Sequence, residues 1–407
     1  MSNINDILYK EFETKMRISC EGVSFRPEIF NHLDLGGEYQ EQVHNLFERD
    51  IDTHVGIELP PFLVLPHEII AGFKADRRSP YSIEYENGKY YIVYEGNELT
   101  QVEFLKRPGY YSLKTSDGTD MRTVAVNNAE GAIFVAYSNE CSLKDTGKDC
   151  LFCNINATKD LYGEVQGIKW KYPSQIGETI AAAYKEGFKH LTISGGFVPE
   201  RREVDYYLDV AESIKTYTGL DTFNGTACIG APRDLTVIEK YKDIGYSTLA
   251  TNIEVWDKNL FKAICPGKDE HCGGRDHWIK ALEYAVKVFG FGNVRSFLVG
   301  GLETRKTTLE GLEYLASIGV VALLSPWSPY PGSAFEGHRS PSWEWHLELA
   351  YRNAAILRKN GLTFEQLYNA SAAVTYPAHD IYRIEDGLLP NFEAKNTTPL
   401  ISLESQV

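Results

Sequence analysis

From residue 131 onward the sequence alternates between short apolar runs and amphipathic segments, and this repeat limits the fold more than any other feature. Six apolar runs typical of buried strands occupy residues 132–136, 190–194, 222–228, 246–253, 294–300 and 320–325. Segments with helical spacing occupy residues 175–185, 202–216, 235–243, 276–288, 309–317 and 343–359. About six strand–helix units imply a parallel sheet with right-handed crossovers. The repeat therefore predicts an α/β fold, a partial or complete (βα) barrel of the TIM type.

The segments on either side of this repeat follow different patterns. Residues 1–130 contain Asn87-Gly88 between alternating apolar residues, which is a strong hairpin signal. We expect this part to be a small α+β extension with a structural role. Residues 131–375 form the predicted barrel. Residues 376–407 have few periodic signals, and we expect a tail that wraps over the surface.

Composition excludes several classes of protein. The chain has 407 residues, of which 43% are hydrophobic and 24% charged, as in an ordinary folded soluble protein. Its net charge of −15 argues against nucleic acid as the main partner, since duplex binding depends on Lys and Arg neutralising phosphates. No apolar run is long enough to span a bilayer, and residues 1–6 lack the features of a secretory signal. Seven cysteines, three of them clustered, fit a reducing compartment, so we expect a cytoplasmic protein without a membrane partner.

Three cysteines within thirteen residues follow the first strand of the repeat, namely Cys141, Cys150 and Cys153. A structural zinc site uses four ligands. A [4Fe–4S] cluster held by three cysteines instead leaves one iron open for a cofactor or a substrate. The trio therefore favours an iron–sulfur cluster, while a zinc-stabilised binding protein and a metal-independent barrel lyase with incidental cysteines stay open as alternatives.

Glycines and polar residues follow the other predicted strands as well. In chain order they are Gly195, Gly196, Cys228, Asn252, Glu254, Ser296, Glu303 and Tyr330. Ligands in barrels of this kind bind at the carboxyl ends of the strands. The convergence of such residues on one face indicates an enzyme.

The cysteine loop after the first strand, with Phe152 just before the last cysteine, resembles the radical S-adenosylmethionine (SAM) superfamily. The resemblance covers residues 130–340 and is greatest to the branch of biotin synthase and the hydrogenase-maturation enzymes. It implies that the three cysteines bind a [4Fe–4S] cluster whose open iron chelates SAM. Reductive cleavage of SAM would then give a 5′-deoxyadenosyl radical that abstracts hydrogen from a small-molecule substrate, with flavodoxin or ferredoxin as electron donor.

The cysteine spacing departs from that family. The usual spacing is three residues and then two, whereas eight residues separate Cys141 from Cys150 here and two separate Cys150 from Cys153. The insertion is polar and contains Gly147. Because lengthening a loop costs little closure entropy, cluster binding is expected to survive the insertion.

The resemblance also implies a SAM site, made by Gly195, Gly196, Asn252, Glu254, Arg275 and Ser296. The two glycines would let the backbone approach the methionine amino group. Asn252 and Glu254 would hold the ribose hydroxyls, as carboxylates do in dinucleotide sites. Arg275 would pair with the methionine carboxylate through its planar fork.

Three further residues, Cys228, Arg295 and Tyr330, are expected to act on or contact the substrate inside the barrel. Arg295 would suit a carboxylate or phosphate, its alternative being an ion pair with a core acid. Cys228 is alternatively a small buried hydrophobe. One cysteine cannot hold the second cluster that biotin synthase uses, so we expect rearrangement or carbon–carbon bond chemistry rather than sulfur insertion, with methyl transfer as an alternative.

Two readings stay open for the segment from Cys265 to Cys272, which also contains His271. Two thiols and an imidazole can ligate an auxiliary metal. A plain loop without a metal is the favoured interpretation.

Overall fold

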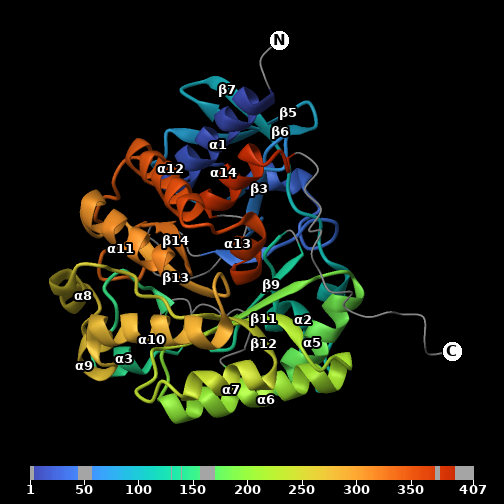
Figure 1. Cartoon of the computed structure of the whole chain (residues 1–407). Helices are drawn as coiled ribbons and strands as arrows, with labels where there is room; N and C mark the ends of the chain where they lie inside the picture. Colours follow the sequence, from blue (N-terminus) through green and yellow to red (C-terminus); the bar gives the residue numbers. More distant parts are fainter. Residues whose placement is uncertain are drawn as a thin grey trace.

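The computed structural model describes residues 4–44, 57–129, 131–138, 140–155, 170–371 and 376–389. At its centre lies a seven-stranded sheet with the order β14-β13-β12-β11-β10-β9-β8 (Figure 1). Its strands are β8 (Val126–Asn127), β9 (Ala132–Ala136), β10 (His190–Ser194), β11 (Phe223–Cys228), β12 (Tyr246–Ala250), β13 (Val294–Gly300) and β14 (Val320–Pro326). Neighbouring strands from β9 to β14 are parallel, and β8 adds an antiparallel edge. The sheet curls into an open half-barrel, which confirms the predicted α/β class in its partial form.

Helices connect the parallel strands. They are α5 (Pro173–Lys185), α6 (Glu200–Thr218), α7 (Val237–Ile244), α8 (Lys258–Ile264), α9 (Pro266–His271), α10 (Gly274–Phe289), α11 (Arg305–Ser317) and α12 (Trp343–Lys359). Local signals set several of their ends: Asp257 accepts from the Asn259 and Leu260 amides at the start of α8, and Thr304 accepts from the Thr307 amide at the start of α11. Most residues of the parallel strands are buried because helices and core cover both faces of the sheet.

The N-terminal part is α+β, as expected. It contains α1 (Ile4–Glu21), β1 (Gln42–His44), β2 (Ile57–Leu59), β3 (Phe62–Val64), β4 (Ile70–Gly72), β5 (Tyr81–Glu86), β6 (Lys89–Tyr94), β7 (Asn97–Val102) and α2 (Met121–Val124). The predicted hairpin is confirmed, with Glu86 opposite Lys89. Asn87 and Gly88 both have positive φ, as the tightest hairpin turn requires.

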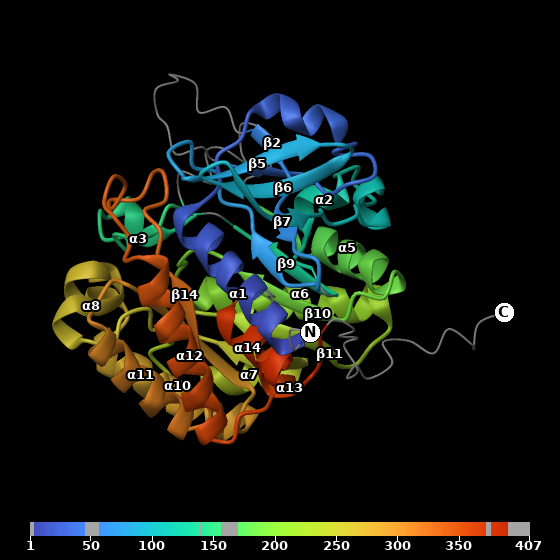
Figure 2. The ribbon, with the colours of Figure 1, turned by 90° about the horizontal axis from the view of Figure 1, so that it is seen from above.

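The expectation of a surface tail after residue 375 is wrong for the part that the structure describes. Residues 377–385 form α14 (Pro377–Glu385), which is buried against α1 and α12 (Figures 1 and 2). The apolar core of the extension continues into α12, α13 (Phe364–Ala370), α14 and β14. Asp380 and Arg383 are buried, and Asp380 pairs with Lys15 of α1. Because charged residues occupy part of the buried face of α14, its sequence lacks the apolar periodicity that predicts a buried helix.

Candidate active site

The cysteine loop starts at the carboxyl end of β9 and crosses the end of β10. A Cβ atom on Gly196 would lie 2.0 Å from the carbonyl oxygen of Glu140 and 3.0 Å from the Cα of Cys141. The Ser142 amide also donates to the carbonyl of Phe197 at 2.8 Å. Gly196 is therefore required for the loop to reach its position, which gives the glycine a local structural reason in addition to its predicted cofactor contact. Gly195 has a similar constraint, since a Cβ there would meet the Tyr137 ring.

The three predicted cluster ligands are half-buried free thiols in this loop, on either side of the short helix α3 (Ser142–Asp145). Burial, together with the neighbouring Cys150 and Cys141 thiols, raises the pKa of Cys153 to about 12. A hydrogen bond with Cys265, together with burial, raises the pKa of Cys150 well above its usual value. Within the described residues, no three His, Cys, Asp or Glu side chains are already gathered as a metal site.

The donor set nevertheless suits an iron–sulfur cluster. Thiolates are the ligands of such clusters, and the three thiols belong to one short loop. The positive charge of Lys268 lowers the pKa of Cys150 in part, so it favours the thiolate that iron requires. The chemistry of the loop thus fits a cluster held by three cysteines.

Lys268, on α9, joins the end of β12 to this loop. Its Nζ donates to the carbonyl of Asn252 at 2.9 Å and forms an ion pair with Glu254 at 3.1 Å. Burial lowers the pKa of Lys268, but the Glu254 and Cys150 charges outweigh it and raise the pKa above its usual value. The ammonium group is therefore charged beside the predicted cluster loop.

Glu254 has a left-handed backbone, with φ of 67°. Its amide donates to the carbonyl of Phe297, and its carbonyl accepts from the amide of Val299, both at 2.8 Å. This backbone costs a non-glycine residue of order 1–3 kcal/mol and persists only where surrounding contacts impose it. The contacts with β13 hold the Glu254 side chain over the mouth of the half-barrel, where it meets Lys268.

Asn252, Ser296 and Arg275 are engaged in the same region. The Asn252 side chain accepts from the Phe297 amide at 3.3 Å and donates to the sulfur of Cys228 at 3.8 Å. Ser296 is fully buried, and its Oγ accepts from the Ile253 amide at 3.0 Å, so it supports the end of β12. Arg275 stacks on Trp256, donates to the Trp256 carbonyl and pairs with Asp276. The structure thus brings Asn252 and Glu254 together, with Arg275 beside them and Ser296 beneath.

Cys228 and Arg295 lie in one row across the sheet. The parallel register aligns Cys228 with Ala250 and Ala250 with Arg295, so the two side chains are two strands apart. Burial raises the pKa of the Cys228 thiol, and the Arg295 charge opposes this rise. The predicted alternative of an ion pair between Arg295 and a core acid is not found among the described residues.

Tyr330 lines a cavity of about 460 Å³ between the extension and the mouth of the half-barrel. The barrel contributes Phe134, Ser325 and Tyr330, and Asn154 comes from the cysteine loop directly after Cys153. Residues of the extension also line the cavity, among them Met16, Gln42, His44, Phe73 and Lys74, and Tyr376 lines it from the segment before α14. The extension therefore lines a cavity beside the cysteine loop, beyond the purely structural role that we expected of it.

Comparison with known proteins bears on this site. No family model matches the chain. The bacteriochlorophyllide c C-7(1)-hydroxylase of Chlorobaculum limnaeum is 28% identical over 300 residues, which are 70% of this chain and 74% of the hydroxylase. The cysteine motif and the half-barrel are those that the resemblance to the radical SAM superfamily implies. Radical SAM enzymes use a [4Fe–4S] cluster and SAM.

Other proteins are similar to this chain in sequence or in structure. An uncharacterised protein of Methanocaldococcus jannaschii is 25% identical over 200 residues, 46% of this chain and 48% of that protein. Methylornithine synthase aligns with a TM-score of 0.45 at 16% identity, over 65% of this chain and 78% of its own. A radical SAM methyltransferase from Sphaerobacter thermophilus aligns with a TM-score of 0.41 at 13% identity, over 70% of this chain and 76% of its own. At these TM-scores the alignments carry no argument about reaction or substrate.

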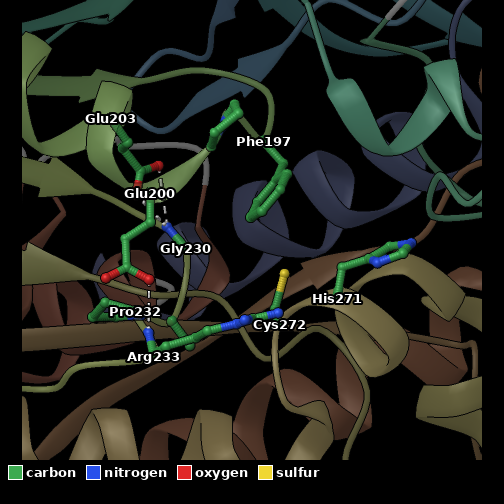
Figure 3. Close-up of a pocket in the computed structure, with 10 residues that line it drawn as sticks. Phe197, Glu200, Glu203, Gly230, Pro232, Arg233, His271 and Cys272 are labelled. Carbon is green, nitrogen blue, oxygen red and sulfur yellow. Dashed lines mark hydrogen bonds between the residues drawn. The ribbon is translucent and has the colours of Figure 1, made fainter.

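A second cavity of about 330 Å³ lies at the ends of β10 and β11 of the half-barrel, against α9 (Figure 3). Glu203 accepts from the Gly230 amide there, and Glu200 accepts from the Arg233 amide. The sulfur of Cys272 points toward the Phe197 ring in Figure 3, whereas the His271 ring points away. Burial raises the pKa of Glu203 to about 8, so the carboxyl group is largely protonated at neutral pH.

The segment from Cys265 to Cys272 is not a plain loop, because it contains α9. Cys265 is fully buried against Cys150, and Cys272 is 2% exposed. Together with His271 they make no metal site in the described part of the chain. The functional residue that sequence reasoning missed here is Lys268. Pro266 could have indicated it, since proline at the first position is a helix-start signal.

Proposed function

We propose that Cys141, Cys150 and Cys153 hold the cluster of this radical SAM enzyme, and that Gly195, Gly196, Asn252, Glu254, Arg275 and Ser296 form its SAM site. When bound, the cluster and SAM supply a 5′-deoxyadenosyl radical, which removes a hydrogen atom from a small molecule. The observation that carries this proposal is the cysteine loop lying over Gly196, beside the polar ends of β10 and β12.

The residues around the site have separable tasks in this proposal. Glu254 accepts from the ribose hydroxyls, and Lys268 pairs with that carboxylate and holds it in place. Lys268 also offsets the negative charge of a cluster held by three thiolates. Ser296 and the β13 backbone fix the position of the β12 end, so that Asn252 and Glu254 are preorganised.

The test begins with protein purified without oxygen. We expect it to be brown and to carry about four irons per chain, with colour that bleaches on reduction. Reduced protein given SAM should release 5′-deoxyadenosine and methionine, and Cys150→Ala should abolish both the iron and the release. Colourless protein with one tightly bound zinc would contradict the proposal. S-adenosylhomocysteine as the product would indicate methyl transfer instead.

We also propose a small redox protein, such as flavodoxin or ferredoxin, as the electron donor, and the cytoplasm as the location. Supporting the location are the seven cysteines, all free. No helix in the described ranges has the length and apolarity needed to cross a membrane. Titration of the oxidised enzyme with reduced flavodoxin should bleach the cluster, and failure with every reduced flavodoxin and ferredoxin tried would count against this donor class.

A further inference from the structure

Arg295 is a buried cation that has no counter-charge within the part of the chain that the structure describes. It is 3% exposed and lies on β13, where Phe297 is its neighbour on the same face. Its Nη1 donates to the Oγ of Ser371 at 3.1 Å, and its guanidinium lies 4.3 Å from the centre of the Phe297 ring. Its Nε is buried and has no hydrogen-bond partner. Among the described residues, no carboxylate pairs with this arginine.

The other titratable groups around Arg295 are neutral at physiological pH. Burial and, to a smaller extent, the Arg295 charge lower the pKa of His190 to about 4 and contribute to lowering that of His379 to about 3. Burial raises the pKa of Tyr376 to about 12, and it also raises the pKa of Cys228. Glu254, whose charge reaches Cys228 and Tyr376, is paired with Lys268. The described residues therefore leave the guanidinium charge uncompensated.

A charge in this position is costly. Transfer of an unpaired ion out of water costs several kcal/mol even after the protein relaxes. One neutral hydrogen bond and one aromatic face offset only a part of that cost. A buried charge that the fold leaves unpaired fits a ligand that brings the opposite charge.

The geometry also indicates what the ligand presents. Nη1 is occupied by Ser371, so the Nε side of the guanidinium is the side left for a ligand. Two parallel N–H groups on that side match the two oxygens of a carboxylate. A single negative charge balances the single positive charge, because every other group in contact is neutral.

This position is connected to the cavity beneath the extension. Tyr376 lines that cavity, packs on Phe297 with 4.6 Å between ring centres, and hydrogen-bonds Ser371. Ser371 in turn accepts from Arg295. A molecule in the cavity beside the cysteine loop thus lies next to the residues that hold the arginine.

We propose that the substrate of this enzyme carries a carboxylate, and that Arg295 binds it inside the half-barrel. This proposal rests on the proposed function, since it names the substrate class of that site. Arg295 is then a substrate-binding residue, and Cys228 lies in the same row of the sheet.

The test uses acetate as a probe on the reconstituted holoenzyme with SAM present, so that SAM occupies the open iron. Acetate should raise the melting temperature by several degrees over chloride of equal ionic strength, because a ligand that binds the folded state stabilises it. Acetamide, the uncharged isostere, should have no effect. Arg295→Gln should lose the acetate response. The control Arg305→Gln should retain it, because Arg305 already pairs with Glu348.

Several results would overturn this proposal. They are an acetate response that survives in Arg295→Gln, no response in the wild type, or a response to phosphate alone. A second variant covers a purely structural role: Arg295→Met should melt no lower than the wild type without acetate, since it removes an unpaired buried charge. A loss of several degrees would show that Arg295 serves the fold instead. None of these measurements requires SAM cleavage. A negative result would therefore contradict carboxylate binding by Arg295 without contradicting the proposed radical reaction.

Discussion

Lys268 and Glu254 form an ion pair at the mouth of the half-barrel, with 3.1 Å between Nζ and the carboxylate oxygen. Their side chains are 15% and 14% exposed, so solvent screens the pair only weakly. The same ammonium group donates to the Asn252 carbonyl and lies near Cys150. One lysine from a six-residue helix therefore connects the predicted ribose-binding residues with the predicted cluster loop.

The first prediction concerns this lysine. Lys268→Met leaves Glu254 buried without its partner, and breaking such a pair costs about 3–5 kcal/mol. We expect this loss in chemical denaturation, together with SAM binding weakened at least about tenfold, or ~1.4 kcal/mol, in equilibrium dialysis. Lys262→Met, at an exposed position on α8, is the matched control and should change neither quantity. If Lys268→Met bound SAM as tightly as the wild type, the ion pair between Lys268 and Glu254 would have no role in SAM binding.

The second prediction decides which cysteines ligate iron. Cys150 makes a hydrogen bond with Cys265, while eight residues separate Cys141 from Cys150 in an atypical motif. We expect Cys141→Ala to lose the cluster and Cys265→Ala to keep about four irons per chain, as measured by iron analysis and absorbance after anaerobic reconstitution. The reverse result would make Cys265 the third ligand.

The alternation of strands and helices could be predicted from the sequence because it depends on local patterns. A strand within a parallel sheet is apolar over its whole length, and a covering helix is apolar on one side. The predicted runs 132–136, 190–194 and 294–300 coincide with β9, β10 and β13. The residues at strand ends are placed by the same patterns, so Asn252 and Glu254 meet as expected.

Contacts that join distant segments could not be predicted in this way. Lys268 reaches Glu254 through α9, and Lys15 reaches Asp380 across almost the whole chain. Two of the helices that the sequence analysis missed, α9 and α14, begin at proline, Pro266 and Pro377. Proline at the first helical position was the available signal. Their few apolar residues gave too little periodicity to reveal which side is buried.

The third prediction tests the link between the two ends of the described chain. The Lys15 and Asp380 side chains are 1% and 0% exposed and pair with each other. Lys15→Met leaves the Asp380 carboxylate buried beside Arg383 and should reduce the free energy of unfolding by about 3–5 kcal/mol. Lys10→Met, on the exposed face of the same helix, should change it by less than about 0.5 kcal/mol. Urea denaturation followed by circular dichroism measures both, and equal effects would contradict the burial of α14.

The last prediction is a pH dependence that originates at Glu203. Burial raises the pKa of this carboxyl group from 4.5 to about 8, and the charge of Glu200 contributes to the rise. The unfolded chain releases the proton near pH 4.5, whereas the folded protein holds it up to about pH 8. The contribution of Glu203 to stability is therefore complete below pH 4.5 and is lost as the pH rises to 8, where the loss reaches roughly 3–5 kcal/mol.

Glu203→Gln should remove this slope, because the amide does not titrate and still accepts from the Gly230 amide. The measurement is the free energy of unfolding of both proteins between pH 4.5 and pH 8, with the variant gaining on the wild type as the pH rises. Glu212→Gln, on the exposed face of the same helix, should follow the wild type. If the unfolding free energies of the wild type and Glu203→Gln changed in parallel with pH, Glu203 would be ionised in the folded protein. The carboxyl group would then line the adjoining cavity as an anion and not as a neutral acid.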